Sequence, residues 1–177
     1  MTELQIRNTI STDLARLSAI DHSIQTEYVW QLDLRRESAQ VDAIFREVRL
    51  PRPVRIDHPR PAAELADIWH LTPMLSAMLD NEAIAYIRFT DKMIPHAVWI
   101  TDVVVAREMR MKGIARKLIS AVESWGAQKG LRRALIETQS KNHPAIRMIH
   151  KLGFEFCGYN DIYYPSRDVA IFFSRAI

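Results

Sequence analysis

The sequence predicts an α+β fold built on a mixed central sheet flanked by helices. A β-branched run, Val98 to Val105, leads through a short basic loop into an amphipathic helix, which is typical of a strand–loop–helix unit. Two apolar runs, Met74 to Leu79 and Ala83 to Phe89, flank Asp80-Asn81-Glu82 and indicate an antiparallel hairpin. The expected order is β-α, an antiparallel meander, then β-α-β-α-β-β, so one sheet combines parallel and antiparallel neighbours.

The segment before this hairpin is predicted from apolar spacing and from proline. A first strand is indicated by Leu4, Ile6 and Ile10, and Ser11 or Thr12 is placed to cap the next helix. The apolar positions of that helix are Leu14, Leu17, Ala19 and Ile20. Alternation then predicts extended segments at residues 28–32 and 41–50. Four of the eight prolines fall within residues 51–61, which predicts a loop, and residues 62–71 are expected to hold a short helix.

The second half of the chain is expected to complete the sheet. Helical spacing begins at Ile114 and continues through Leu118, Val122 and Trp125, and Gly130 is placed to end this helix. The remaining expected elements are a strand at residues 133–138, a helix at 145–152, and strands at 156–164 and 169–174.

The loop between the β-branched run and its helix is the most informative stretch. It reads Arg110-Met111-Lys112-Gly113-Ile114-Ala115, and all five glycines of the chain lie between Gly113 and Gly158. Free backbone N–H groups, the positive end of the helix dipole and nearby cations make such a loop an anion site. A phosphate or pyrophosphate is the ligand it suits. The alternative is an ordinary β-turn-α connection with solvated basic residues.

This loop resembles the acetyl-CoA loop of the GNAT superfamily of N-acetyltransferases, Arg/Gln-x-x-Gly-x-Gly/Ala, with Arg110, Gly113 and Ala115 at its fixed positions. A second stretch, Asn142-x-x-Ala145 followed by Lys151-Leu152-Gly153-Phe154, resembles the later motif of the family. The resemblance covers about residues 99–154. The run Ile136-Glu137-Thr138-Gln139 looks closest to the streptothricin-acetyltransferase-like branch.

One position departs from the family pattern. The tyrosine that often protonates the leaving thiolate falls on Ile149, and isoleucine donates no proton. His150 is adjacent in sequence, but one helical step turns a side chain by about 100°.

The resemblance implies a sheet splayed between the glycine-loop strand and the next strand, with the pantetheine arm in the cleft. The arm is expected to pair with the backbone of Val103 and Val105, and the pyrophosphate to lie on the amides of residues 111–116. Asn142 is expected either to contact the arm or to cap the second helix beside Pro144. The expected acetyl-CoA residues are Val103, Val104, Val105, Arg110, Met111, Lys112, Gly113, Ile114, Ala115, Arg116, Asn142 and Ala145.

Acyl transfer to an amine requires a base, because only the free amine attacks the thioester. Asp102 interrupts the apolar strand and is expected half-buried with a raised pKa, which suits a base. Its alternative role is a bond to a neighbouring loop. Glu137 is the reserve base, with an outward solvated side chain as its alternative. A backbone N–H near Val104 is the candidate oxyanion contact.

The family builds its acceptor pocket from the first helices and the last two strands. Tyr28, Trp30 and Asp161 are therefore the candidate substrate residues. Tyr163 or Tyr164 is the candidate general acid in place of the missing tyrosine, and the alternative is an amphipathic strand position for both.

Composition favours one domain spanning residues 1–177, with nearly half of its residues apolar. The net charge of +3 is spread along the chain, which disfavours nucleic-acid binding. A lone cysteine, Cys157, excludes an intrachain disulfide, and the scattered histidines indicate no metal site. No membrane-spanning run or signal-peptide core is recognised, so a cytoplasmic monomer or homodimer is expected.

The predicted function is acetyl transfer from acetyl-CoA to a primary amine by direct attack. Small-molecule amines, aminoglycoside-like or lysyl-type, are the first expectation, and a protein N-terminus or lysine is the second. A non-catalytic acyl-CoA-binding module is the alternative from another class, and Ile149 is the feature that favours it.

Overall fold

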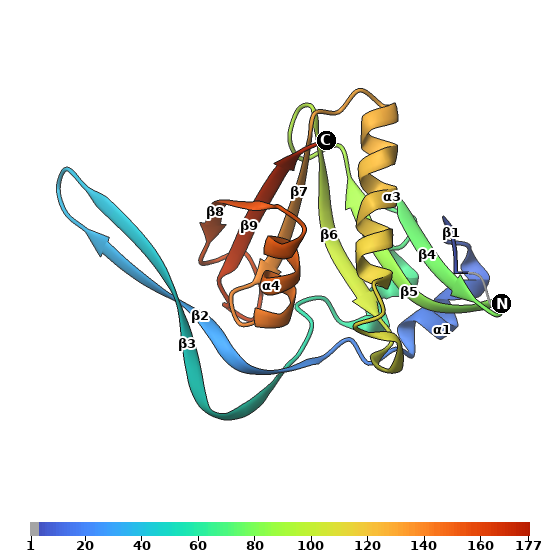
Figure 1. The fold of residues 1–177 in the computed structure, drawn as a ribbon, viewed down its shortest axis with the longest axis horizontal. Helices are drawn as coiled ribbons and strands as arrows, with labels where there is room; N and C mark the ends of the chain where they lie inside the picture. Colours follow the sequence, from blue (N-terminus) through green and yellow to red (C-terminus); the bar gives the residue numbers. More distant parts are fainter. Residues whose placement is uncertain (1–3) are drawn as a thin grey trace. The chain divides into compact units, whose positions relative to one another are not determined.

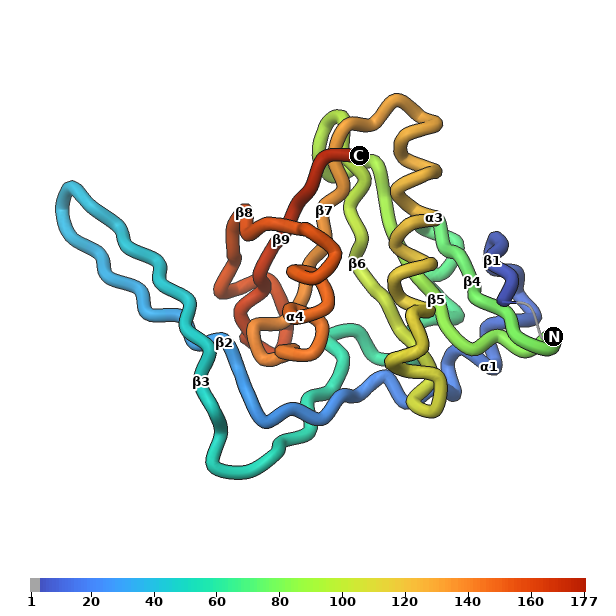
Figure 2. The backbone as a smooth tube through the Cα atoms, viewed as in Figure 1, coloured from blue at the N-terminus to red at the C-terminus, as the bar shows by residue number. Residues whose placement is uncertain are grey.

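The computed structural model describes residues 4–177 (Figures 1 and 2). Its backbone divides into two compact units. The first unit contains the residues up to His22, Arg60–Glu137 and Phe173–Ile177, and the second contains Ser23–Pro59 and Thr138–Phe172. The chain length predicts one domain over residues 1–177, and this single domain stays a prediction.

Seven strands form one sheet in the order β1-β4-β5-β6-β7-β9-β8, and β2 pairs with β3 in a separate two-stranded sheet. β6 and β7 are parallel, whereas β1–β4, β4–β5 and β5–β6 pair antiparallel. The mixed sheet with helices beside it confirms the predicted α+β class.

The first unit holds most of the strands and the longest helix. Its strands are β1 (Gln5–Asn8), β4 (Met74–Leu79), β5 (Glu82–Thr90) and β6 (Ala97–Val105). Its α-helices are α1 (Leu14–Ser18), α2 (Leu65–Ile68) and α3 (Ile114–Gln128), and short 3-10 turns occur at Ser11–Asp13, Ala62–Glu64 and Arg107–Met109. β7 (Arg133–Gln139) and β9 (Ala170–Ala176) each have residues in both units.

The core of the first unit lies on both faces of β5, which explains why this strand is buried almost throughout. α3 crosses β5 and β6 in Figure 1 and buries its apolar stripe, as its helical spacing predicts. A second cluster joins α1 and α2 to the sheet through Leu17, Leu65, Tyr86 and Val104.

The second unit is built around a long hairpin. β2 (Ile24–Arg36) and β3 (Val41–Ile56) form a two-stranded ribbon that is easily traced in Figure 2. The other elements of this unit are α4 (His143–Lys151) and β8 (Glu155–Asn160).

The predicted loop at residues 51–61 is wrong over its first half, because β3 continues to Ile56. Pro51 and Pro53 fall where the β2–β3 register shifts, between the pairs Thr26–Val54 and Tyr28–Arg49. Residues in a bulge of a two-stranded ribbon do not need to donate a backbone N–H to the partner strand. Proline has no N–H, so it is tolerated at those positions.

Two other expectations at element ends are corrected. The strand predicted at residues 156–164 ends at Asn160, so Tyr163 and Tyr164 lie in the connection to β9 rather than in a strand. Neither Ser11 nor Thr12 caps the first helix through its side chain. Instead, the Asp13 carboxylate accepts a bond from the Ile10 N–H at 3.0 Å.

Asp13 also anchors β1. Its carboxylate is 5% exposed and accepts two bonds from Arg7, at 2.7 and 2.8 Å. The hydrogen bonds from Arg7 hold the pKa of the Asp13 carboxyl below its ordinary value, against the opposing effect of burial.

Asp13→Asn is expected to lower the free energy of unfolding by about 1–3 kcal/mol at neutral pH, because the charged bonds to Arg7 are lost. A depressed folded-state pKa stabilises the protein above the unfolded-state pKa. The difference between variant and wild type should therefore shrink as the pH falls through the folded-state pKa of Asp13. Urea unfolding at several pH values measures it, and a difference that stays constant down to acid pH contradicts the assigned ion pair.

Within residues 4–177, no helix combines the length and the apolar character that a membrane span requires.

Candidate active site

The strand that leads into the glycine loop is paired with its parallel neighbour over its first half. Within the first unit, β6 pairs with β7 from Ala97–Arg133 to Ile100–Ile136, and β6 continues to Val105. On its other side β6 stays paired with β5 as far as Val105. We call the residues of the first unit that follow this parallel pairing, Thr101–Val105 on β6 and Glu137 on β7, the fork; the splayed sheet expected from the resemblance stays a prediction. A register shift in the β5–β6 ladder falls at Thr101, the first residue of the fork on β6.

The glycine loop ends in the N-terminus of α3. Gly113 is the N-cap residue at φ +78°, a left-handed conformation that favours glycine. The first bond within the helix runs from the Lys117 N–H to the Gly113 carbonyl at 3.1 Å, so the N–H groups of residues 114–116 precede the helical ladder. No side chain caps this end of α3. These amides and the helix dipole are suited to a phosphate.

Arg110 holds the loop in place from within the first unit. Its Nε donates to the Val105 carbonyl at 2.9 Å, and its Nη2 donates to the Asp21 carbonyl at 2.7 Å. Burial lowers the pKa of Arg110 from its ordinary value, although a guanidinium stays protonated at neutral pH. The side chain of Arg110 therefore ties the loop to the end of β6.

Both predicted bases lie at the fork and are joined by one arginine. Asp102 is 3% exposed and Glu137 5% exposed. Arg60 Nη1 donates to Asp102 Oδ1 at 3.0 Å, and Arg60 Nη2 forms a short bond to Glu137 Oε1. Asp102 is thus more buried than predicted and is bonded to a neighbouring loop, and Glu137 is not solvated. Their roles as bases stay predictions.

Other donors complete the carboxylate pair. Thr101 Oγ1 donates to Asp102 Oδ2 at 2.9 Å, and Arg88 Nε lies 3.4 Å from the same oxygen. The Trp99 indole donates to Glu137 Oε2 at 2.6 Å. Burial was expected to favour the neutral acid at Asp102. The adjacent guanidinium groups act in the opposite sense to burial, and the raised pKa expected for Asp102 stays a prediction.

Tyr86 on β5 is the buried phenol of this region. Burial, and then the charge of Asp102, raise the pKa of Tyr86 well above its ordinary value. The phenol therefore stays neutral.

In the second unit, Asn142 caps α4. Its side-chain oxygen accepts a bond from the Ala145 N–H at 3.2 Å, with Pro144 in the first turn. This is the alternative that the sequence left open for Asn142.

The predicted acceptor residues Tyr28 and Trp30 pack against histidines of α4. Tyr28 lies 5.1 Å from the His143 ring, and Trp30 lies 5.7 Å from the His150 ring. His143 also contacts Glu47 at 2.9 Å. The Trp30 indole nitrogen is buried and has no acceptor among the described residues. His143 was missed by the sequence interpretation, because scattered histidines carry no distinguishing signal, and His150 was considered there only as the neighbour of Ile149.

The remaining candidates occupy the connection and hairpin ends of this unit. Asp161 is exposed and lies 4.0 Å from Arg36. Tyr163 and Tyr164 contact each other edge to face, with ring centroids 5.0 Å apart, and Tyr163 also contacts Phe172. Tyr164 is 5% exposed, so Tyr163 is the more accessible phenol.

Ile149, at the family's tyrosine position, is 1% exposed on the buried side of α4. Ile149→Tyr is expected to lower the free energy of unfolding by about 1–3 kcal/mol, because a larger side chain overfills a packed site. The rate of acetyl transfer should not rise. Chemical denaturation measures the stability, and Ile149→Leu, which conserves volume, is the control. A stable and faster Ile149→Tyr variant would contradict the buried placement.

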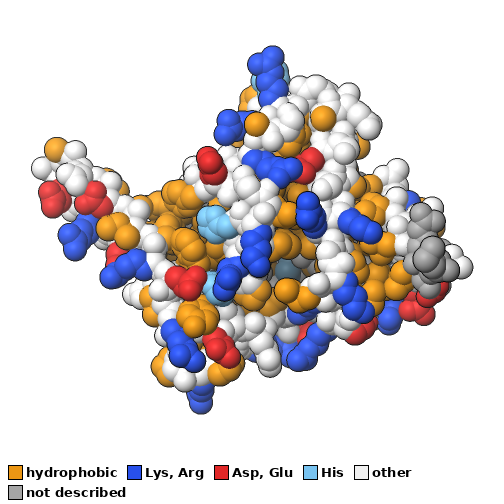
Figure 3. Space-filling view, in the orientation of Figure 1, with side chains coloured by type: hydrophobic (Ala, Val, Ile, Leu, Met, Phe, Trp, Pro, Cys, Tyr) orange, Lys and Arg blue, Asp and Glu red, His pale blue; other side chains and the backbone are white. Residues whose placement is uncertain are grey.

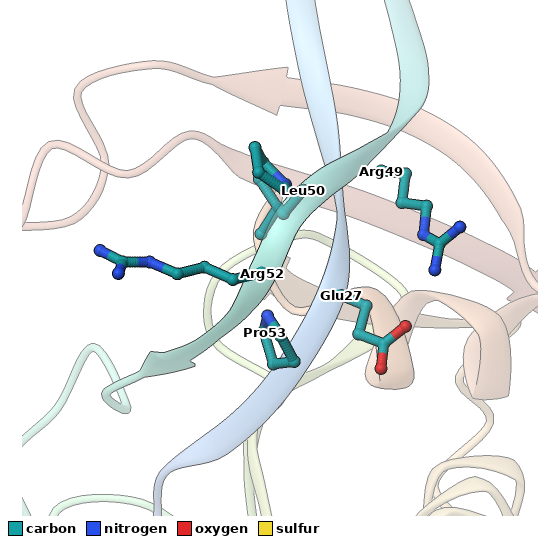
Figure 4. Close-up of a pocket in the computed structure, with 6 residues that line it drawn as sticks. Glu27, Arg49, Leu50, Arg52 and Pro53 are labelled. Carbon is teal, nitrogen blue, oxygen red and sulfur yellow. The ribbon is translucent and has the colours of Figure 1, made fainter.

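A cavity of about 430 Å³ lies on the hairpin, lined by Glu27 and residues 49–53. Arg49 and Arg52 point away from each other on either side of β3 (Figure 4). None of the predicted site residues lines this cavity. Over residues 4–177, no group of three or more His, Cys, Asp and Glu side chains is arranged to hold a metal ion. On the face in Figure 3, Lys and Arg side chains are scattered among apolar and polar ones.

Comparison with known proteins identifies the family. The model of the acetyltransferase (GNAT) family matches residues 41–154. Aminoglycoside N(6')-acetyltransferase type 1 of Salmonella typhimurium is 31% identical over 102 residues, which cover 52% of this chain and 68% of that protein. Streptothricin acetyltransferase of Escherichia coli is 34% identical over 68 residues, covering 38% of this chain and 39% of that protein.

Solved structures share the fold. A crystal structure of nourseothricin acetyltransferase superimposes with a TM-score of 0.82 at 20% identity, covering 98% of both chains. A Bacillus anthracis structure named for streptothricin acetyltransferase, in complex with acetyl coenzyme A, gives a TM-score of 0.76 at 20% identity and covers 99% of this chain and 100% of that chain. Because the family model spans well over half of the sequence, this chain belongs to the GNAT family of acetyltransferases.

Proposed function

We propose that this chain transfers the acetyl group of acetyl-CoA to a primary amine of a small molecule by direct attack. One observation carries the proposal: within the first unit the parallel pairing of β6 with β7 ends at Ile100 and Ile136, and β6 runs on to Val105, ahead of the glycine loop that opens α3. We assign the acetyl-CoA site to this continuing stretch of β6 and to the amides of the loop.

Acetyl-CoA would use both features. The pantetheine arm pairs with the backbone of Val103 and Val105, and the pyrophosphate lies on the amides of residues 111–116. Arg110 positions the loop through the Val105 carbonyl rather than reaching the phosphates with its side chain. Asn142 and Ala145 form the cap of α4 in the second unit. We assign them to acetyl-CoA binding through that helix end.

The chemistry proceeds through one tetrahedral intermediate. The free amine attacks the thioester carbonyl, the C–N bond forms, and a backbone N–H near Val104 binds the oxyanion. Asp102 takes the amine proton, directly or through water, with Glu137 as the reserve base. The C–S bond then breaks, and the thiolate of CoA receives a proton from Tyr163, Tyr164 or solvent.

The acceptor class rests on the named relatives, which are an aminoglycoside and a streptothricin acetyltransferase. We assign aminoglycoside-like or lysyl-type amines to this chain, with Tyr28, Trp30 and Asp161 as acceptor contacts. The reaction takes place in the cytoplasm, on a monomer or homodimer with one domain over residues 1–177.

A panel of acceptors tests this assignment. The purified chain is incubated with acetyl-CoA and with aminoglycosides, streptothricin, free lysine, and peptides that carry a free N-terminus or a lysine. Thiol release should be fastest with a small polyamine. Faster acetylation of peptides than of small-molecule amines would indicate that the chain is a protein acetyltransferase. Tight CoA binding with no acceptor turned over would favour a non-catalytic acyl-CoA-binding module.

A further inference from the structure

Arg60 lies at the fork and contacts Thr101, Asp102 and Glu137 there. It follows the hairpin between two prolines, and its side chain is 24% exposed. Its guanidinium contacts the carboxylates of Asp102 and Glu137, and Nη1 also donates to the Thr101 carbonyl at 3.0 Å. One side chain therefore reaches both branches of the fork at the first residues after the parallel pairing ends.

The backbone contact of Arg60 falls at an irregular point of the β5–β6 ladder. Thr101 is the extra residue in the β5–β6 ladder, directly after the last residue of β6 that pairs with β7. A carbonyl at such a point loses its ladder donor, and leaving it unbonded is costly. Arg60 supplies that donor, so the Thr101 carbonyl is hydrogen-bonded by a side chain from outside the sheet.

The charge contacts compensate a buried pair of like charges. Two buried carboxylates are destabilising unless cations and hydrogen bonds balance them. Each of the four carboxylate oxygens accepts a hydrogen bond: from Arg60 on one oxygen of each group, from Thr101 on the second oxygen of Asp102, and from Trp99 on that of Glu137. Arg88 adds an ion pair with Asp102 at 3.4 Å. Arg60 contacts both carboxylates.

We propose that Arg60 is a positioning residue for acetyl transfer: it bridges Asp102 and Glu137 at the fork and stabilises the ionised form of Asp102. The inference rests on the proposed function, in which Asp102 accepts the amine proton. Without Arg60, the Asp102 carboxylate loses an adjacent cation, which favours its neutral acid. Asp102 then enters the reaction partly protonated and accepts the amine proton poorly.

The groups that face the carboxylates after removal of Arg60 come from two strands. β5 contributes Arg88 and the neutral phenol of Tyr86, and β6 contributes Thr101 and the indole of Trp99. Among these groups Arg88 carries a charge, and it forms an ion pair with Asp102.

Arg60→Met and Arg60→Lys test the proposal, with Arg16→Met as the matched control. Arg16 belongs to the same unit and pairs with Glu82 at 3.4 Å, but this ion pair is exposed. The first readout is the melting temperature at pH 5 and pH 8, which requires no activity. Arg60→Met should melt at least about 5 °C below wild type at pH 8 and closer to it at pH 5, where protonation of Asp102 relieves the unbalanced charge. Arg60→Lys should lie between them, and Arg16→Met should match wild type.

The second readout is steady-state kinetics in a double-mutant cycle. Arg60→Met should lower kcat about tenfold or more at neutral pH, with both KM values within about threefold of wild type. In the Asp102→Asn background, the same change should have little further effect, because Arg60 acts through Asp102.

Each readout has a contradicting result. Equal melting losses at pH 5 and pH 8 would mean that Arg60 does not govern the protonation of Asp102. Additive losses of kcat in the Arg60→Met/Asp102→Asn variant would mean that it does not act through Asp102. A wild type that acetylates nothing would overturn the proposed function and the catalytic part of this inference, and the melting curves would still decide whether Arg60 balances the pair.

Discussion

Asp102→Asn is expected to lower kcat about 100-fold or more, with CoA affinity almost unchanged. The amide keeps the size of the side chain and removes its ability to accept a proton. Asp102 lies on the stretch of β6 that follows the parallel pairing with β7, beside the strand segment proposed to bind the pantetheine arm. Activity should be partly rescued at high pH, where the acceptor amine is already deprotonated in water.

The control for this variant is Asp13→Asn. Asp13 is also a buried carboxylate bonded to an arginine of the first unit, but it lies away from the fork. Its loss should reduce stability and leave kcat per folded molecule unchanged. Equal kcat values and pH profiles for Asp102→Asn and wild type would transfer the base role to Glu137 or to water. Glu137→Gln separates these two possibilities.

Gly113→Glu is expected to weaken CoA binding at least tenfold, about 1.4 kcal/mol. The added carboxylate would stand at the N-terminus of α3, where the proposed pyrophosphate lies, and would repel it. Isothermal titration with CoA measures the effect. Because Gly113 has a φ of +78°, any side chain there also strains the backbone, and this strain needs its own control.

Gly130→Glu supplies that control. Gly130 follows the other end of α3, has a φ of +74°, and has open space where a Cβ would be placed, as Gly113 does. Both variants should lose similar stability, and only Gly113→Glu should lose CoA affinity. Unchanged CoA affinity in a folded Gly113→Glu variant, or equal losses of CoA affinity in both variants, would contradict the binding of the pyrophosphate at this loop.

The fold was predictable where one local pattern determines the structure. The helix from Ile114 and the meander before it follow from periodicity, and the structure places the glycine of the predicted loop at the N-cap of that helix. The prolines at 51 and 53 misled the prediction. Proline cannot donate a hydrogen bond to a neighbouring strand, so from sequence alone it indicates a loop. The bulge in this two-stranded ribbon accommodates both prolines within the strand.

The candidate site was predictable in part. Period two placed Asp102 on the buried side of its strand, and the later motif led to Asn142 as a possible cap. Arg60 was not predictable. In its proline-rich segment it resembles Arg52 and Arg55, and only the tertiary structure brings it to Asp102 and Glu137, 42 and 77 residues away in sequence.

The most direct test of the proposed function is the stoichiometry of acetyl transfer. The purified chain, acetyl-CoA and a small polyamine such as streptothricin are mixed, and free thiol and N-acetylated amine are quantified together over time. We expect one N-acetyl product for each thiol released, at a rate proportional to enzyme and reduced about 100-fold or more in Asp102→Asn. Saturable CoA binding with no N-acetyl product from any amine of the panel would contradict the proposed function.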